Sequence, residues 1–445
     1  MLSNLVLPIL LSVSCGGCTD SSELNAVQPA SQVVPSKLEV RIPDQAFRNP
    51  EAPISLEFTE DVEWRGGFVQ LRKFDGTEYQ TIETFDSSDF GAADSRLTIS
   101  GNTLNIAPSD ELESLVSYAV RIAPGAVEGV SGQPFAGLNT DSATLIRSGA
   151  RFERPKISRG DYKHVVENQT FNSDFDAKSD TLYVNSTFKR NVDVSDVSNV
   201  AFVNSTFTNR RGYGISIADA SNIKIAGSTF RKIRDTAILL RRSGSTRNVS
   251  IFNNDIAEIG GDGIHAAKRF KRNVDHINLV IYDNKVRDVG LKKKDLYHGI
   301  YTQSSEVKII NNHVSGFVDG NGISIRSDGV VWGNYINIVS GRDKGSGIKY
   351  FSDHKTGKSK TLTIADNTVI GSRLYSAIQF DMAEQVIPNN IAPQDFVVNH
   401  FRVLRNNVDA RFGYVVEATL KDAPWSRFEL VGDSKWPDPH WKIIR

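Results

Sequence analysis

The chain has 445 residues, of which 39% are hydrophobic and 23% are charged, proportions typical of a soluble globular protein. Lys and Arg together number 52, and so do Asp and Glu, so the formal net charge is zero. No overall field therefore draws the chain to nucleic acid, and we expect no nucleic-acid partner. An anionic partner would have to be met by a local basic patch.

An apolar run over residues 5–13 precedes the two cysteines of the chain, Cys15 and Cys18. The run is too short to span a bilayer and is typical of a bacterial export signal. We expect residues 1–18 to be a signal peptide of the lipoprotein type, lipidated at Cys15 or Cys18, and residues 19–36 to be a polar tether. The protein would be an outer-membrane or cell-surface lipoprotein, or secreted, and would contact a membrane only through its lipid. A cytoplasmic protein with a mis-set start is the other alternative, because no Lys or Arg precedes the apolar run.

Short segments of alternating apolar and polar residues, separated by turn signals, occupy residues 37–148. This alternation predicts antiparallel strands packed as a small β-sandwich. Residues 118–127, together with 58–62 and 132–137, resemble the bacterial Ig-like domains of surface-layer and cell-surface proteins. The resemblance implies a spacer or a binding accessory, and it carries no catalytic residue over to this chain.

Two short patterns alternate from about residue 180 to residue 410, and each occurs seven times. The first is an Asn-containing strand start, found at residues 185–188, 204–207, 253–256, 283–286, 311–314, 333–336 and 366–369. The second is a Gly-Ile or Ala-Ile strand, found at residues 214–215, 237–238, 263–264, 299–300, 322–323, 347–348 and 377–378. Successive Ile residues of the second pattern lie between 23 residues (Ile215 to Ile238) and 36 residues (Ile264 to Ile300) apart.

A repeat of this length made only of short strands predicts the coils of a β-helix, stacked about 4.8 Å apart. Asn suits the turns because it tolerates left-handed backbone and can form ladders along the axis. The alternation resembles the PbH1 repeats of the right-handed parallel β-helix superfamily, which holds pectate and alginate lyases, several glycosidases, mannuronan epimerases and phage tailspikes. We therefore expect an all-β monomer, with a right-handed parallel β-helix over residues 150–423 and a C-terminal cap over residues 424–445.

The Ile of each Gly-Ile strand is expected to point inward, so the residues one and three positions later point outward. The middle four coils then gather His265, Tyr301, Gln303, Arg326 and Lys349 within a strip about 15 Å tall. We call these outward positions the central strip. The residues two positions before each Ile add Asp262, His298 and Asn321, whose direction the sequence leaves open. A polar face that simply meets water is the alternative interpretation of the strip.

Enzymes of the resembled superfamily often act on uronic acids, and the central strip offers groups for β-elimination. This reaction neutralises a carboxylate, removes the adjacent proton and protonates the leaving oxygen. The candidate catalytic residues are His298, Tyr301, His265 and Lys349. The candidate substrate-binding residues are Arg326, Gln303, Asn321, Asp262, Arg241 and Lys268. The sequence thus favours a polysaccharide lyase acting on an acidic glycan.

Two basic segments, residues 268–272 and 292–294, follow neighbouring coils of the strip. They could steer an acidic polysaccharide toward it, or they could be solvated loops. Since both cysteines lie before residue 20, we expect no disulfide and no thiolate metal site in the folded part. Calcium would need clustered carboxylates, whereas the strip shows Asp262 and Asp381 in distant coils, so no cofactor is expected.

Three alternatives to a lyase stay open. A glycoside hydrolase needs two carboxylates flanking the bond, and the central coils show no obvious pair, although Asp288, Asp295 and Asp319 lie nearby in sequence. Residues 297–301 resemble the His-Gly-aromatic strand of mannuronan C5-epimerases, but residues 262–267 lack the Tyr-Gly-Phe-Asp-Pro-His signature of that family. A non-catalytic surface protein that binds glycan or a partner is the third alternative.

Overall fold

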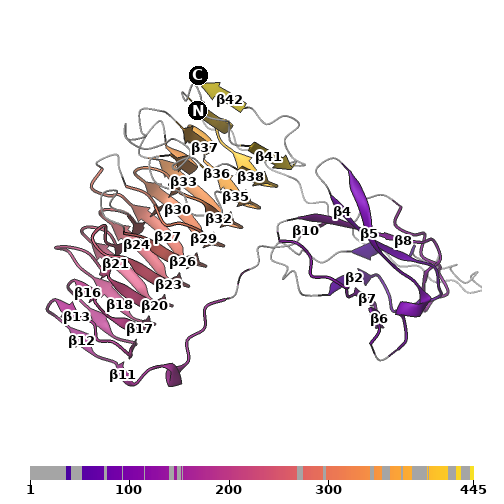
Figure 1. Cartoon of the computed structure of the whole chain (residues 1–445), viewed down its shortest axis with the longest axis horizontal. Helices are drawn as coiled ribbons and strands as arrows, with labels where there is room; N and C mark the ends of the chain where they lie inside the picture. The colour runs from indigo at the N-terminus through magenta and orange to yellow at the C-terminus, as the bar shows by residue number, and fades with distance from the viewer. Residues whose placement is uncertain are drawn as a thin grey trace, which may run out of the picture.

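A computed structural model of the chain shows an all-β protein whose described part contains no α-helix. The described residues are 37–41, 53–74, 78–92, 94–114, 116–139, 145–147, 152, 154–267, 274–293, 297–340, 345–352, 361–371, 374–382, 398, 400–418, 427–431 and 441–444. Two short 3-10 turns occur, η1 (Ser87–Asp89) and η3 (Arg159–Asp161). Figure 1 shows a long stack of strands beside a smaller unit formed by the earlier part of the chain.

The smaller unit, here called the N-terminal unit, contains two four-stranded antiparallel sheets, ordered β1-β2-β7-β6 and β10-β8-β4-β5, and the antiparallel pair β3-β9. Its strands are β1 (Val40–Arg41), β2 (Ile54–Phe58), β3 (Val62–Trp64), β4 (Val69–Phe74), β5 (Tyr79–Phe85), β6 (Leu97–Ser100), β7 (Thr103–Ile106), β8 (Ser117–Ile122), β9 (Val127–Gly129) and β10 (Leu145–Arg147). The apolar residues that alternate along these strands share one buried core.

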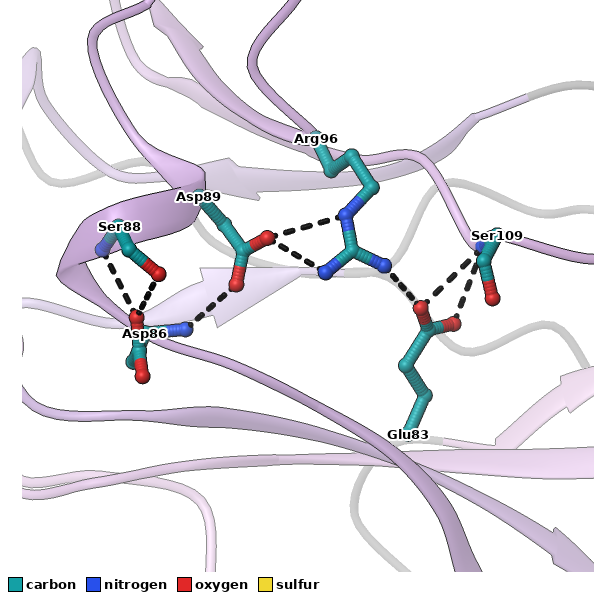
Figure 2. A network of polar contacts seen from close by, with 6 residues as sticks. All are labelled: Glu83, Asp86, Ser88, Asp89, Arg96 and Ser109. Carbon is teal, nitrogen blue, oxygen red and sulfur yellow. Dashed lines mark hydrogen bonds and ion pairs between the residues drawn. The ribbon is translucent and has the colours of Figure 1, made fainter.

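A polar network crosses the N-terminal unit beside η1 (Figure 2). Arg96 lies between two carboxylates: it donates to Asp89 through two nitrogens, at 3.0 and 2.5 Å, and forms an ion pair with Glu83. Asp86 caps η1 by accepting from the backbone N–H of Ser88 at 2.8 Å. These bonds tie the β5–β6 connection to β5 through Arg96 and Glu83.

The rest of the chain winds through three parallel sheets, so the structure confirms the predicted parallel β-helix. The first sheet contains β11 (His164–Glu167), β14 (Thr181–Val184), β17 (Ser198–Val203), β20 (Ala220–Ala226), β23 (Thr246–Phe252), β26 (His276–Tyr282), β29 (Val307–Ile310), β32 (Gly329–Trp332), β35 (Thr361–Ala365), β38 (His400–Leu404) and β41 (Arg427–Val431). The second contains β12 (Thr170–Phe171), β15 (Thr187–Phe188), β18 (Thr206–Thr208), β21 (Thr229–Ile233), β24 (Asp255–Ile259), β27 (Lys285–Val289), β30 (His313–Val318), β33 (Tyr335–Ser340), β36 (Thr368–Ile370) and β39 (Asn407–Asp409). The third contains β13 (Phe175–Asp176), β16 (Val192–Ser195), β19 (Ile215–Ala218), β22 (Ile238–Leu240), β25 (Ile264–Ala266), β28 (Ile300–Thr302), β31 (Ile323–Ile325), β34 (Ser346–Phe351), β37 (Ser376–Met382), β40 (Phe412–Ala418) and β42 (Trp441–Ile444).

Like residues stack on like residues inside the solenoid. Phe171, Phe188, Phe207 and Phe230 form a column of parallel rings with centroids 4.8, 5.0 and 4.5 Å apart. The coils that follow in the chain, called the upper coils here, continue this column with Ile and Val, as at Ile256 and Val286. The inner residues are buried apart from those of the first coil, such as Phe171, which are partly buried, so the stack has a continuous apolar core.

The two properties expected of the recurrent Asn belong to adjacent positions. The first position of each turn has positive φ, as at Asn253 (56°), Asn311 (51°) and Asp366 (52°). The second position forms a buried ladder in which each amide donates to the amide oxygen of the next coil at 2.9 to 3.0 Å. Its members are Asn254, Asn284, Asn312, Asn334, Asn367 and Asn406, and Ser186, Ser205 and Ser228 hold the same position in lower coils.

The glycine of the Gly-Ile strands is required where neighbouring coils approach closely. A Cβ added at Gly299 would lie 2.5 Å from the carbonyl oxygen of Gly322 and 2.7 Å from Val314. We expect Gly299→Ala to lower the free energy of unfolding by about 1 to 3 kcal/mol, because it overpacks a filled site. Urea unfolding followed by circular dichroism measures this. Gly413→Ala is the matched control, since its Cβ would meet nothing closer than 3.5 Å, and an equal loss in both variants would contradict the steric argument.

Candidate active site

The predicted outward column lies in register along the third sheet. Neighbouring strands pair Ser216 with Leu239, Leu239 with His265, His265 with Tyr301, and so on along the axis. The same line continues through Ser324, Lys349 and Gln379. Parallel register therefore places the candidate side chains of successive coils one above another, about 4.8 Å apart.

Asp262 joins two coils of the central strip. Its Oδ2 lies 2.7 Å from Nδ1 of His265, and its Oδ1 accepts the backbone N–H of His298 at 2.5 Å. This answers the question of direction that the sequence left open, because the carboxylate faces the outward column. A carboxylate only accepts, so neutral His265 carries its proton on Nδ1 and presents an unprotonated Nε2. The pair has the geometry of a general base held by a carboxylate.

His298 is held in the opposite tautomer. The backbone N–H of Asn321 donates to Nδ1 of His298 at 2.9 Å. A backbone N–H cannot accept, so the proton of neutral His298 is on Nε2. His298 is thus suited to donate a proton, and of the two histidines only His265 has the form of a base. The side-chain oxygen of Asn321 in turn accepts from the backbone of Ser346 at 2.9 Å, which fixes the amide.

Tyr301 lies at the centre of the strip. Its ring stacks on His265, with centroids 4.6 Å apart and planes 16° apart, and on His298 at 5.4 Å. Gln303 donates to the phenol oxygen at 2.5 Å. Both Tyr301 and Gln303 are buried, so a polar face that simply meets water does not describe these two residues. These contacts fix the Tyr301 ring between the two histidines and its hydroxyl against Gln303.

Arg326 lies between two aromatic rings. Its guanidinium carbon is 5.0 Å from the ring centroid of Tyr301 and 4.4 Å from that of Phe351. Two rings near one guanidinium stabilise its charge through cation–π contacts and favour a fixed orientation of the group. The sequence pattern gave no role to Phe351, although its position three residues after Ile348, in the coil that follows that of Arg326, marks it as an outward residue.

Lys349 forms an ion pair with Asp381 of the next coil at 3.1 Å, and both side chains are largely buried. Its ammonium also lies 5.2 Å from the Phe351 centroid. An ammonium engaged in this way neutralises a charge rather than removing a proton, so the structure favours His265 over Lys349 as the base.

Some predicted residues are not brought to the central strip. Arg241 contacts Asp193 at 3.4 Å and donates to Ser195, two coils nearer the start of the solenoid. Lys292 forms an ion pair with Asp235, which favours a structural turn for that basic segment. Lys268, the rest of residues 268–272, and residues 294 and 295 lie outside the described residues.

The carboxylates near the strip have partners of their own. Asp288 accepts the backbone N–H of Phe317 at 3.0 Å and so holds a turn of the second sheet. Within the described ranges, no group of three or more His, Cys, Asp or Glu side chains is placed to hold a metal ion. No helix in the described part of the chain is long and apolar enough to cross a membrane.

A comparison with protein families agrees with this architecture. The sequence profile of the family described as "Right handed beta helix region" matches residues 139–273 and 213–391, which together cover more than half of the chain. The A-module of mannuronan C-5 epimerase AlgE4 from Azotobacter vinelandii is 12% identical, with a TM-score of 0.38, over 63% of this chain and 90% of that one. The tailspike gp61 of Pseudomonas phage phi297 is 12% identical, with a TM-score of 0.25, over 86% of this chain and 61% of that one. No curated protein matches the sequence significantly.

Proposed function

Since the chain belongs to the right-handed beta-helix family, we propose that the outer face of its third sheet acts on an acidic, uronate-containing polysaccharide and cleaves it by β-elimination. The observation that carries the proposal is the pair of histidines held in opposite tautomers around Tyr301. Such a pair can take a proton at one point and return one nearby.

Each group in the strip has one task in this reaction. Arg326 binds the uronate carboxylate through the edge of its guanidinium and stabilises the charge that develops there. Nε2 of His265 takes the proton from the carbon beside the carboxylate. The bond from the sugar to the leaving oxygen then breaks, a carbon–carbon double bond forms, and Tyr301 or His298 donates a proton to the leaving oxygen.

Three alternatives to a lyase, namely a hydrolase, an epimerase and a glycan-binding protein, differ from it in the geometry of the site they need or in the product they form. Asp262 and Asp381 are four coils apart, about 19 Å by strand spacing. Hydrolases place their carboxylates roughly 5 to 9.5 Å apart, so this pair does not support hydrolysis. An epimerase shares the proton abstraction but leaves the chain intact. Binding without turnover would leave the polymer unchanged.

Incubation with a panel of uronate polymers tests the proposal. A lyase gives the ultraviolet absorbance of an unsaturated uronate, and a hydrolase gives new reducing ends without that absorbance. An epimerase changes the uronate composition without shortening the polymer. Binding with none of these changes would identify a glycan-binding surface and overturn the lyase.

Arg326→Ala is expected to weaken both binding and turnover by about 10- to 100-fold, because a hydrogen-bonded charge contact contributes about 1.5 to 3 kcal/mol. Calorimetric binding of uronate oligosaccharides and initial rates measure the two effects. Arg326→Lys keeps the charge but loses the paired N–H groups, so it should recover part of the binding. Arg411→Ala, at an exposed position, is the control. Unchanged binding in Arg326→Ala would remove Arg326 from the site.

We also propose that the chain is exported and anchored through a lipid on Cys15 or Cys18, as the apolar run over residues 5–13 suggests. In the native host, palmitate should label the wild type, and the double substitution Cys15→Ser and Cys18→Ser should abolish the label. An unlabelled wild type in the cytosolic fraction would contradict both export and anchoring.

The N-terminal unit fits the same setting. We propose that it is an Ig-like domain acting as a spacer or binding accessory. The two antiparallel sheets around one core support this proposal, together with the resemblance of residues 118–127 to such domains.

A further inference from the structure

The outer face of the first sheet carries an apolar column, with one residue from each coil. Its upper members are Phe252, Tyr282, Ile310, Trp332, Ala365 and Leu404. All are buried and pack as one cluster, although they point away from the solenoid core. An outward column that is buried is covered by another part of the same chain, which makes it an interaction surface.

The segment leading into the solenoid covers the lower part of this column. The ring of Phe152 packs on Tyr282 with centroids 5.0 Å apart. Further along, the carbonyl of Lys156 accepts from the ammonium of Lys224 at 2.6 Å. Residues 152–162 therefore run down the outside of the first sheet, from the coil of β26 toward β11, a path visible in Figure 1.

At the upper end, Arg405 makes a contact between the solenoid and the N-terminal unit. It donates to both oxygens of Asp366, at 2.8 and 2.7 Å, and to the hydroxyl of Ser117 in β8 at 3.3 Å. Trp332 of the apolar column donates to the same Asp366 at 3.0 Å. The Arg405 side chain is only 3% exposed, so each bond offsets the cost of burying a charge.

The position of Arg405 in the repeat is unusual. It occupies the first turn position, with φ of 52°, where other coils have Asn, Asp or Gly. These three residue types tolerate left-handed backbone, whereas an arginine there is strained. A strained, buried arginine is retained when its side chain makes a contact that the shorter Asn could not make. Here the third guanidinium nitrogen of Arg405 donates to Ser117, which is 288 residues away in sequence.

We propose that Arg405 locks the N-terminal unit onto the outer face of the first sheet. The N-terminal unit is then rigidly attached to the solenoid. It has one orientation relative to the candidate active site on the third sheet, unlike a domain joined by a flexible linker. The partner of this surface is the start of the chain's own β8, at Ser117, together with Phe152 and residues 154–162. This lock does not depend on the proposed glycan chemistry.

Small-angle X-ray scattering of the full chain tests the lock. Arg405→Asn keeps a residue suited to the left-handed turn and removes the reach to Ser117. Arg405→Asn also loses the ion pair with Asp366, so a second variant is needed. Ser117→Lys places a like charge against Arg405 and leaves the sequence of the solenoid unchanged. Both variants should broaden the distribution of interatomic distances and increase the radius of gyration, while circular dichroism stays unchanged.

Arg411→Asn, at an exposed position near the same end, is the control and should scatter like the wild type. Wild-type scattering from both test variants would overturn the lock. A change in Arg405→Asn alone would also overturn it, because Arg405 would then act only within the solenoid.

Discussion

His265→Ala is expected to lower turnover of the cleaved polymer by a factor of about 100 to 10,000, the usual effect of losing a proton-transfer group. Asp262 fixes the Nδ1 proton of His265, so the substitution removes the unprotonated Nε2 that faces the strip. Binding should change little, because Arg326 remains to hold the carboxylate. Initial rates from product absorbance and calorimetric binding separate the two effects. Asp262→Asn should also reduce turnover, since an amide N–H can favour the other tautomer.

Ser216→Ala is the matched control for His265→Ala, since Ser216 lies in the same outward column two coils away. It should retain wild-type rates, and both variants should melt near the wild-type temperature. If His265→Ala still cleaves a polymer that the wild type degrades at the same rate, the base lies elsewhere and the roles given to the strip are wrong.

Asn312→Ala is expected to lower the free energy of unfolding by about 3 to 5 kcal/mol, because it leaves one buried N–H without a partner, at about 1 to 3 kcal/mol, and removes further hydrogen bonds worth about 1 kcal/mol each. The Asn312 amide donates to the carbonyls of Ile281 and Ile310 and to Asn334, each at 3.0 Å. Its oxygen accepts from the backbone and the amide of Asn284. Alanine would leave the backbone N–H of Asn284 without its acceptor and would remove one hydrogen bond each from Ile281, Ile310 and Asn334. Urea unfolding measures the loss.

Asn407→Ala is the control for the ladder, because Asn407 is exposed at the start of β39. Its effect should stay within about 0.5 kcal/mol. Equal destabilisation by the two substitutions would mean that the ladder contributes no more than an ordinary surface asparagine.

The parallel β-helix and its outward column could be predicted from the sequence, because period-two strands and a fixed coil repeat determine which side chains share a face. The direction of Asp262 and His298 could not, since both precede a strand at a turn, where alternation fails. Neither could the tautomers of the histidines, which depend on a carboxylate at one ring and a backbone N–H at the other. The role of Phe351 was hidden because its contact with Arg326 lies between coils.

The division of the recurrent Asn into two positions was equally beyond the sequence. Adjacent residues such as Asn253 and Asn254 look alike in the repeat, yet the first adopts the left-handed conformation of the turn while the side chain of the second joins the buried ladder. Only the stacking of coils distinguishes them, because the ladder partner of Asn254 is Asn284, 30 residues away.

The segment from Phe152 to Tyr162 contacts several coils of the first sheet before the chain enters β11, and this path determines how the molecule would respond to a pulling force. The chain enters the solenoid at β11, after contacts with the coils of Tyr282, Lys224 and Asn199. A pull on the N-terminus would therefore act along the solenoid axis and load these contacts together, in shear. Peeling β11 away strand by strand would require the segment to detach first, so the rate of forced unfolding would be limited by that detachment.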